Sequence, residues 1–176
     1  MGVGDKELVQ WFLDHGFKLD FEEHEMGRSH LSHAVARKNF DMVQFLVKKG
    51  ADVNRATGDF AEPPLVEACR CGEWKIAEFL LEHGADPALG SIHQAYALNY
   101  AARRGGLEAA RLLLERGAKV DSVDFENMTP LEWAVEDKNK PMLDLLIRHG
   151  ATVPKRLVPT IVRRFGKTVL REATIK

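Results

Sequence analysis

The sequence predicts an all-α protein, a solenoid in which short helix pairs stack in a row, and three periodic features carry this prediction. Glycines that follow an apolar helix pattern recur at steps of 34, 34, 33 and 33 residues, at positions 16, 50, 84, 117 and 150. A Leu-x-x-Ala signature keeps the same phase, starting at positions 31, 65, 98 and 131. Ahead of each glycine from position 50 on, apolar residues recur at helical spacing, as in the stretch from Met42 to Leu46. Units of this length cannot bury their apolar faces alone, so we expect them to stack on one another.

The elements are expected to follow one another in a fixed order. Residues 5–16 predict the second helix of a leading half-repeat. Four units follow, each with a helix, a tight turn, a second helix and a polar loop, at about 17–50, 51–84, 85–117 and 118–150. In the last unit Thr129 fits the N-cap position, and Pro130 fits the first helical position, where its missing N–H is no loss. The array is therefore expected to occupy residues 1–152.

The stretch 153–176 differs from the array in charge. It carries a net charge of +6, whereas residues 1–152 carry −7. Apolar residues such as Leu157 and Phe165 give it an apolar side as well. Because the end of a solenoid must be covered, this pattern favours a basic capping segment that folds back on the last unit. A basic tail that makes weak contacts with anionic partners is the alternative.

Two of the repeated motifs resemble those of the ankyrin-repeat family. The segment Thr129-Pro130-Leu131-Glu132-Trp133-Ala134 matches the family's T-P-L-H-x-A signature, and residues 50–54 carry its Gly-Ala-Asp-Val-Asn run. The resemblance covers roughly residues 5–153, and it implies helix-turn-helix repeats joined by β-hairpin-like loops. The family's histidine, which braces the neighbouring turn, is replaced in all four units, so this bracing is expected to be lost or rebuilt. The replacing residues are Ser32, Val66, Asn99 and Glu132.

Composition and charge exclude several functional classes. A formal net charge of −1 argues against a globally basic nucleic-acid binder, so nucleic acid is not the expected partner. Two cysteines cannot form a disulfide framework and favour a reducing compartment. No apolar run reaches the roughly 18 residues that span a bilayer, and the start lacks the features of a secretory signal. We therefore expect an intracellular protein, in the cytoplasm, the nucleus or both.

The sequence offers few groups for catalysis or metal binding. It lacks the G-x-S-x-G, H-E-x-x-H, P-loop and G-x-G-x-x-G motifs. Cys69 and Cys71 are two residues apart, so on a helix they point about 200° away from each other and cannot share one ion. His30 and His33 have helical spacing, but no further ligand follows at a sequence spacing typical of a metal site. We therefore expect no metal, no cofactor and no catalytic residue, which favours a non-enzymatic protein.

One row of residues does not fit this plain interpretation. The position two residues after each leucine of the Leu-x-x-Ala signature is usually apolar in the family, and here it holds His33, Glu67, Tyr100 and Trp133. The common register places these side chains next to one another in consecutive units, about 10 Å apart. A buried Glu67 must be hydrogen-bonded or reach solvent. The structural interpretation is a satisfied polar network. The functional alternative is a small-molecule-binding or catalytic site that uses Glu67 with His33 or Tyr100.

The expected working surface follows from the resemblance. In ankyrin-like arrays the loop tips and the exposed side of the first helices form a concave groove, and here this surface is rich in aromatic, Met and Arg residues. We predict that the groove binds another protein, and its arginines suit an acidic peptide or surface. The predicted partner-binding residues are Met26, Arg28, Arg37, Phe60, Glu62, Arg70, His93, Arg103, Arg104, Phe125 and Met128. Since the chain starts within a repeat, an activity carried by other parts of a longer protein stays an open alternative.

Overall fold

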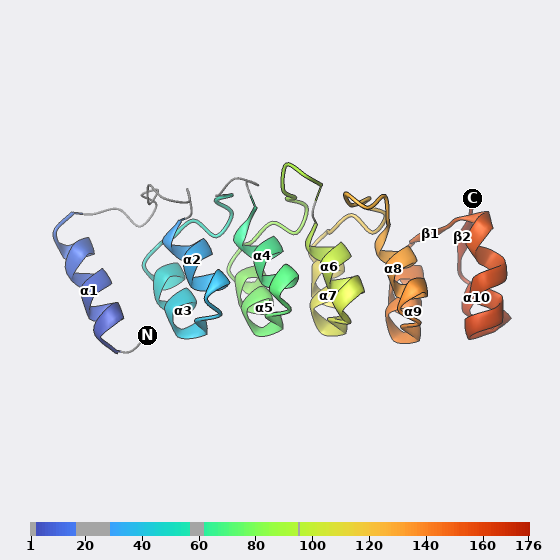
Figure 1. Cartoon of the computed structure of the whole chain (residues 1–176), viewed down its shortest axis with the longest axis horizontal. Coiled ribbons are helices and arrows are strands. Elements are labelled where there is room, and N and C mark those ends of the chain that lie inside the picture. Colours follow the sequence, from blue (N-terminus) through green and yellow to red (C-terminus); the bar gives the residue numbers. More distant parts are fainter. Residues whose placement is uncertain (1–2, 17–28, 57–61, 95) are drawn as a thin grey trace.

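The structure, a computed structural model, describes residues 3–16, 29–56, 62–94 and 96–176, in which helix pairs stack in a single row (Figure 1). Helix α1 (Val3–Asp14) lies at one end of the row. The helix pairs that follow are α2 (His30–Ala36) with α3 (Phe40–Lys48), α4 (Pro64–Cys71) with α5 (Trp74–Glu82), α6 (Ala97–Arg104) with α7 (Leu107–Glu115), and α8 (Pro130–Glu136) with α9 (Lys140–Arg148). The predicted solenoid of helix pairs is therefore confirmed.

Local hydrogen bonds explain where several of these helices begin. At the start of α8, Thr129 Oγ1 accepts the Glu132 N–H at 3.3 Å, and the Glu132 carboxylate accepts the Thr129 N–H at 2.8 Å. Asn39 and Asn139 cap α3 and α9, because each side-chain oxygen accepts the N–H of the residue three positions later at 3.1 Å. The first turns thus satisfy backbone donors that would otherwise have no partner inside the helix.

Left-handed backbone positions end the helices at regular intervals. The five glycines that mark the sequence period have φ between 86° and 94°, a conformation that glycine adopts without the steric cost of a Cβ. The turn inside each helix pair uses the same conformation. Gly72 and Gly105 hold it in two pairs, whereas Lys38 and Lys138 hold it in the other two, with φ of 57° and 55°.

The core runs along the row between the two layers of helices. First helices pack on first helices, from α2 through α4 and α6 to α8, and second helices pack on second helices, from α3 through α5 and α7 to α9. The leucine of each Leu-x-x-Ala signature is at most 2% exposed in this core. The approach of α5 to α7 is close at Gly106, where a Cβ would lie 2.8 Å from ring atoms of Trp74. Packing at this density leaves room for glycine alone.

Side-chain amides connect consecutive units. Asn54 donates to the Gly84 carbonyl at 3.1 Å and accepts the Asp86 N–H at 2.8 Å. Asn99, which stands in the position of the family's histidine, donates to two carbonyls of the next loop, Ser122 at 3.1 Å and Met128 at 2.9 Å. Since Asn99 is buried, these bonds satisfy groups that could not reach water. At this unit the bracing of the neighbouring turn is rebuilt by an amide.

The segment after α9 folds back along the last helix pair. Its elements are β1 (Thr152–Val153), the 3₁₀ turn η1 (Lys155–Leu157), α10 (Val158–Phe165), the 3₁₀ turn η2 (Lys167–Leu170) and β2 (Thr174–Ile175). Strands β1 and β2 pair in parallel, with Thr152 opposite Thr174 and Val153 opposite Ile175.

Contacts with α8 also hold this segment. The Ile161 side chain is fully buried, and Arg164 donates to the Val135 carbonyl at 2.5 Å. Arg156 pairs with the buried carboxylate of Glu132. These are the kinds of contact that a capping segment would make. The capping role, the division of the chain at residue 152 and the unit boundaries within the array stay predictions.

Candidate functional site

Four arginines of the predicted groove lie at the C-terminal ends of first helices and form two matching pairs. Arg37 and Arg104 hold the same position in their units, and so do Arg70 and Arg103. Arg37 and Arg104 are exposed, and neither has an ion-pair partner in the described part of the chain. The side chains of Arg70 and Arg103 are 39% and 41% exposed, and both are engaged by carboxylates of this chain.

Arg70 binds two carboxylates at once. Its Nε donates to Glu62 Oε2 at 3.2 Å, and its Nη2 pairs with Glu67 Oε2. The Cys71 thiol lies 3.7 Å from the other Glu67 oxygen and donates to it. The side chains of Glu62 and Glu67 are only 15% and 7% exposed, so the charges of this Arg70 cluster are largely compensated from within.

Glu62 and Glu67 share the Arg70 guanidinium, and ionising both of these carboxyl groups costs more free energy than ionising a single one in water. Burial, followed by a hydrogen bond with Glu67, raises the pKa of Glu62 to about 7. The Glu62 carboxyl group therefore keeps its proton to higher pH than a free glutamate does, and in this form it can donate a hydrogen bond to Glu67. Burial and then the negative charge of Glu62 also raise the pKa of Tyr100, which places the Tyr100 phenol near the same cluster.

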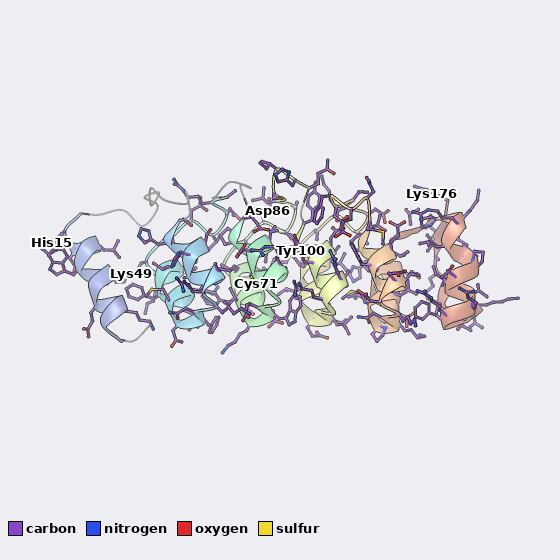
Figure 2. All side chains as sticks on the ribbon, in the orientation of Figure 1. His15, Lys49, Cys71, Asp86, Tyr100 and Lys176 are labelled. Carbon is purple, nitrogen blue, oxygen red and sulfur yellow. The ribbon has the colours of Figure 1, made fainter. Side chains whose placement is uncertain are left out.

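The unusual row of the sequence lies on the first helices as expected. Glu67 and Trp133 are buried, whereas His33 and Tyr100 are half-buried. Tyr100 and Cys71, which are labelled in Figure 2, lie on neighbouring helix pairs in the middle of the row. Because Glu67 is held by Arg70 and its neighbours, its surroundings match the structural interpretation of a satisfied polar network. A catalytic or ligand-binding role for His33, Glu67 and Tyr100 stays a prediction.

Arg103 is held by the loop of the following unit. Its Cζ lies 4.2 Å from the centre of the Trp133 ring, and its Nη1 donates to Glu126 at 2.6 Å. The Trp133 indole N–H in turn donates to the buried carboxylate of Asp124 at 2.6 Å. Because Asp124 also accepts two N–H groups of its own loop, this chain of contacts fixes the loop against α6 and α8.

The loops that precede α6 and α8 contain turns of the same geometry. In one loop the Gln94 N–H donates to the Ser91 carbonyl at 3.0 Å, and in the other the Asn127 N–H donates to the Asp124 carbonyl at 2.9 Å. Gln94 and Asn127 have nearly equal left-handed φ values, 57° and 58°. Each of the two lies ten residues after the period glycine that ends the preceding unit, Gly84 or Gly117. The two loops are thus copies of one turn, displaced by one repeat.

These matched turns display two apolar side chains in register. Ile92 and Phe125 are the second residues of their turns and are 65% and 56% exposed. In both turns the side-chain oxygen of the first residue accepts the N–H of the third residue, at 3.3 Å and 2.9 Å. Equivalent positions of neighbouring units lie about one helix-packing distance apart, roughly 10 Å. The structure therefore holds two exposed apolar groups at a defined spacing, which we name the Ile92–Phe125 pair.

The other predicted partner-binding residues fall into three groups. His93 is exposed beside Ile92, whereas Met128 is half-buried and its carbonyl accepts from Asn99. Three further predicted residues, Met26, Arg28 and Phe60, lie outside the described residues. Ile92 is missing from the predicted set, although its separation of 33 residues from Phe125, one full period, was a signal that could have included it.

The described residues offer no other obvious chemistry. Within these ranges no group of three or more His, Cys, Asp or Glu side chains could hold a metal ion. Burial raises the pKa of the Cys69 thiol to about 12, which makes it a poor nucleophile. None of the helices in these ranges combines the length and the apolar character needed to cross a membrane.

Comparison with known proteins adds to this geometry. A sequence model described as ankyrin repeats (3 copies) matches residues 1–91 and 88–157, which together make up most of the chain. The match covers all four helix pairs and the Ile92–Phe125 pair.

Individual relatives are similar over one to two hundred residues. The chain is 35% identical over 112 residues to the ankyrin repeat and KH domain-containing protein mask-1 of Caenorhabditis elegans, covering 64% of this chain and 4% of that protein. It is 34% identical over 115 residues to a putative ankyrin repeat-containing protein of Treponema pallidum, and this alignment covers 65% of this chain and 38% of that protein. It is 28% identical over 152 residues to human inversin, and this alignment covers 85% of this chain and 14% of inversin. The chain thus spans well under half the length of these relatives.

Proposed function

This chain belongs to the ankyrin-repeat family, whose repeats generally mediate contacts between proteins, and from this premise we propose that it binds a protein partner through its concave groove. The observation that carries the proposal is the Ile92–Phe125 pair. Both apolar side chains are exposed on matched, hydrogen-bonded turns, so little of the backbone has to be ordered when a partner covers them. Aromatic and aliphatic anchors of this kind supply much of the energy of protein contacts.

The charges of the groove support an acidic peptide or an acidic protein surface as the partner. Arg37 and Arg104 are exposed and have no ion-pair partner among the described residues, so their guanidinium groups are free for carboxylates of a partner. Arg70 and Arg103 are already engaged by Glu62, Glu67 and Glu126, so we expect them to contribute less. The Ile92–Phe125 pair then anchors the partner, and the two free arginines select its charge.

The test is affinity capture from an extract of the source organism with the immobilised chain and three variants. The double variant Ile92→Ser with Phe125→Ser removes the apolar pair, and Arg37→Glu with Arg104→Glu reverses the free charges. Ile175→Ser is the matched control, because it removes a 44% exposed apolar side chain at another place in the molecule. Circular dichroism and the melting temperature show whether each variant keeps its fold.

We expect proteins captured by the wild type and by Ile175→Ser to be depleted at least tenfold with the serine double variant. Partners that stay bound to this double variant, with the fold intact, would rule out the Ile92–Phe125 pair as the anchor. Partners lost with the serine variant but retained after charge reversal would leave the groove in place and exclude an acidic partner.

A further inference from the structure

The C-terminal end of the array carries cations that the fold leaves uncompensated. Arg156 pairs with Glu132, and Arg164 donates to the Val135 carbonyl, so both cations are engaged within the molecule. The five other cations of the segment are exposed and have no ion-pair partner in the part of the chain that the structure describes. These residues, the basic end, are Lys155, Arg163, Lys167, Arg171 and Lys176. Glu172 is the single acidic residue between 153 and 176.

The basic end lies at one tip of an elongated molecule. Helix α10 is the last layer of the row, and α1 lies at the opposite end (Figure 1). Figure 2 shows Lys176 and His15 at these two ends. Because residues 1–152 carry a net charge of −7 and residues 153–176 carry +6, positive and negative charge are separated along the long axis. Such a molecule turns its basic end toward an anionic surface.

We propose that the basic end docks on an anionic membrane surface, with the solenoid projecting away from it. An anionic membrane that meets the tip of the row attracts the five cations, while most of the acidic residues 1–152 stay far from its surface. A long nucleic acid would have to pass the acidic body wherever it extends beyond the tip. The same end also offers apolar groups that suit the headgroup boundary, since Ile175 is 44% exposed and Phe165 is half-buried.

This proposal goes beyond the protein contact proposed above and does not depend on it. The groove lies along the first helices and loop tips, whereas the basic end lies on α10 and the turns around it. A membrane at the tip therefore leaves the Ile92–Phe125 pair accessible to a partner. Each cation near an anionic membrane contributes a factor of about five to binding, and the attraction weakens with salt.

Vesicle cosedimentation of the full chain tests the proposal. The probes are vesicles of phosphatidylcholine alone and vesicles with 30% phosphatidylserine, at low and at physiological salt, together with a 20-base-pair DNA duplex as the competing polyanion. The tail variant is Arg163→Gln with Lys167→Gln and Arg171→Gln. The matched control, Lys48→Gln with Lys119→Gln and Lys138→Gln, removes three exposed cations from the body. Because all six side chains are exposed, the variants are expected to keep the wild-type melting temperature.

The wild type is expected to bind the phosphatidylserine vesicles, to bind less at higher salt and to leave the phosphatidylcholine vesicles unbound. The tail variant should bind about a hundredfold more weakly, whereas the body control should stay within about threefold of the wild type. Absence of vesicle binding by the wild type overturns the proposal, and so does an equal loss in both triple variants. Tighter binding to the duplex than to the vesicles would assign the basic end to nucleic acid instead.

Discussion

At the residue scale, the groove contains charged groups with two different roles. Arg70 and Arg103 hold carboxylates of their own chain, while Arg37 and Arg104 remain exposed. A half-buried ion pair stabilises the fold only when its partners stay together, because loss of one partner leaves a desolvated charge. Substitution of Arg70 would therefore disturb folding as well as binding, and the two exposed arginines give a cleaner test of recognition.

Replacing Glu62 with Gln is expected to change how stability depends on pH. The pKa of Glu62 is about 7 in the folded chain and about 4.3 in an unfolded chain, so the folded state holds more protons between these values. This contribution to stability is present at low pH and is lost as pH rises through 7. The Gln variant should lack this loss. As pH rises from 4.5 to 7.5, its free energy of unfolding should therefore increase by about 1 to 2 kcal/mol relative to that of the wild type. The difference is no larger because solvent screens the partly exposed cluster.

Urea unfolding at pH 4.5, 6 and 7.5 measures this difference. Glu82→Gln, which changes an exposed glutamate at the end of α5, is the control and should follow the wild type at all three pH values. If the free energies of unfolding of the wild type and of Glu62→Gln changed with pH in parallel, Glu62 would not hold the extra proton in the folded state.

At the element scale, helix packing and loop geometry depend on a few close contacts between units. The first turn of α5 brings Trp74 against Gly106 at the start of α7. In the loops, buried Asp124 and its hydrogen bonds to Trp133 and two N–H groups fix the turn that carries Phe125. The position of Phe125 therefore depends on contacts between its loop and α8.

Gly106→Ala tests the close approach of α5 and α7. The backbone φ of −75° at Gly106 suits alanine, so the cost comes from the new Cβ against the Trp74 ring. We expect a loss of about 1 to 3 kcal/mol in the free energy of unfolding, measured by urea titration. In a Trp74→Leu background the same substitution should cost at least 1 kcal/mol less. Equal costs in the two backgrounds would show that the ring is not the obstacle.

At the scale of the whole molecule, stability comes from contacts between neighbouring units. Each helix pair packs on the pairs before and after it, so a change at one end weakens the adjacent unit most. The segment 153–176 joins this series through buried Ile161 and through the pairing of β1 with β2. If it acts as a cap, its loss should be felt in α8 and α9 before it is felt in the middle of the row.

Ile161→Ala tests the capping role. Truncation of a fully buried isoleucine is expected to cost about 2 to 4 kcal/mol, whereas Val162→Ala at the half-buried neighbour should cost less than 1 kcal/mol. Amide hydrogen exchange should show faster opening of α8 and α9 and nearly unchanged opening of α4 and α5. Uniform changes along the row, or none in α8 and α9, would mean that the segment does not cap the array.

The period of the sequence was sufficient to predict the helix pairs, their order and their stacking, because apolar spacing and turn glycines act locally and repeat in every unit. It also indicated the N-cap at Thr129 and the row of first-helix residues that includes the buried Glu67. The pairing of Arg70 with Glu62 and Glu67, the rebuilt bracing by Asn99, and the exposure of Ile92 became visible with the coordinates. The first two features are contacts across elements or units, and the third depends on how the loop before α6 folds. Such features depend on side-chain rotamers and on how the units pack, which a repeat pattern does not encode.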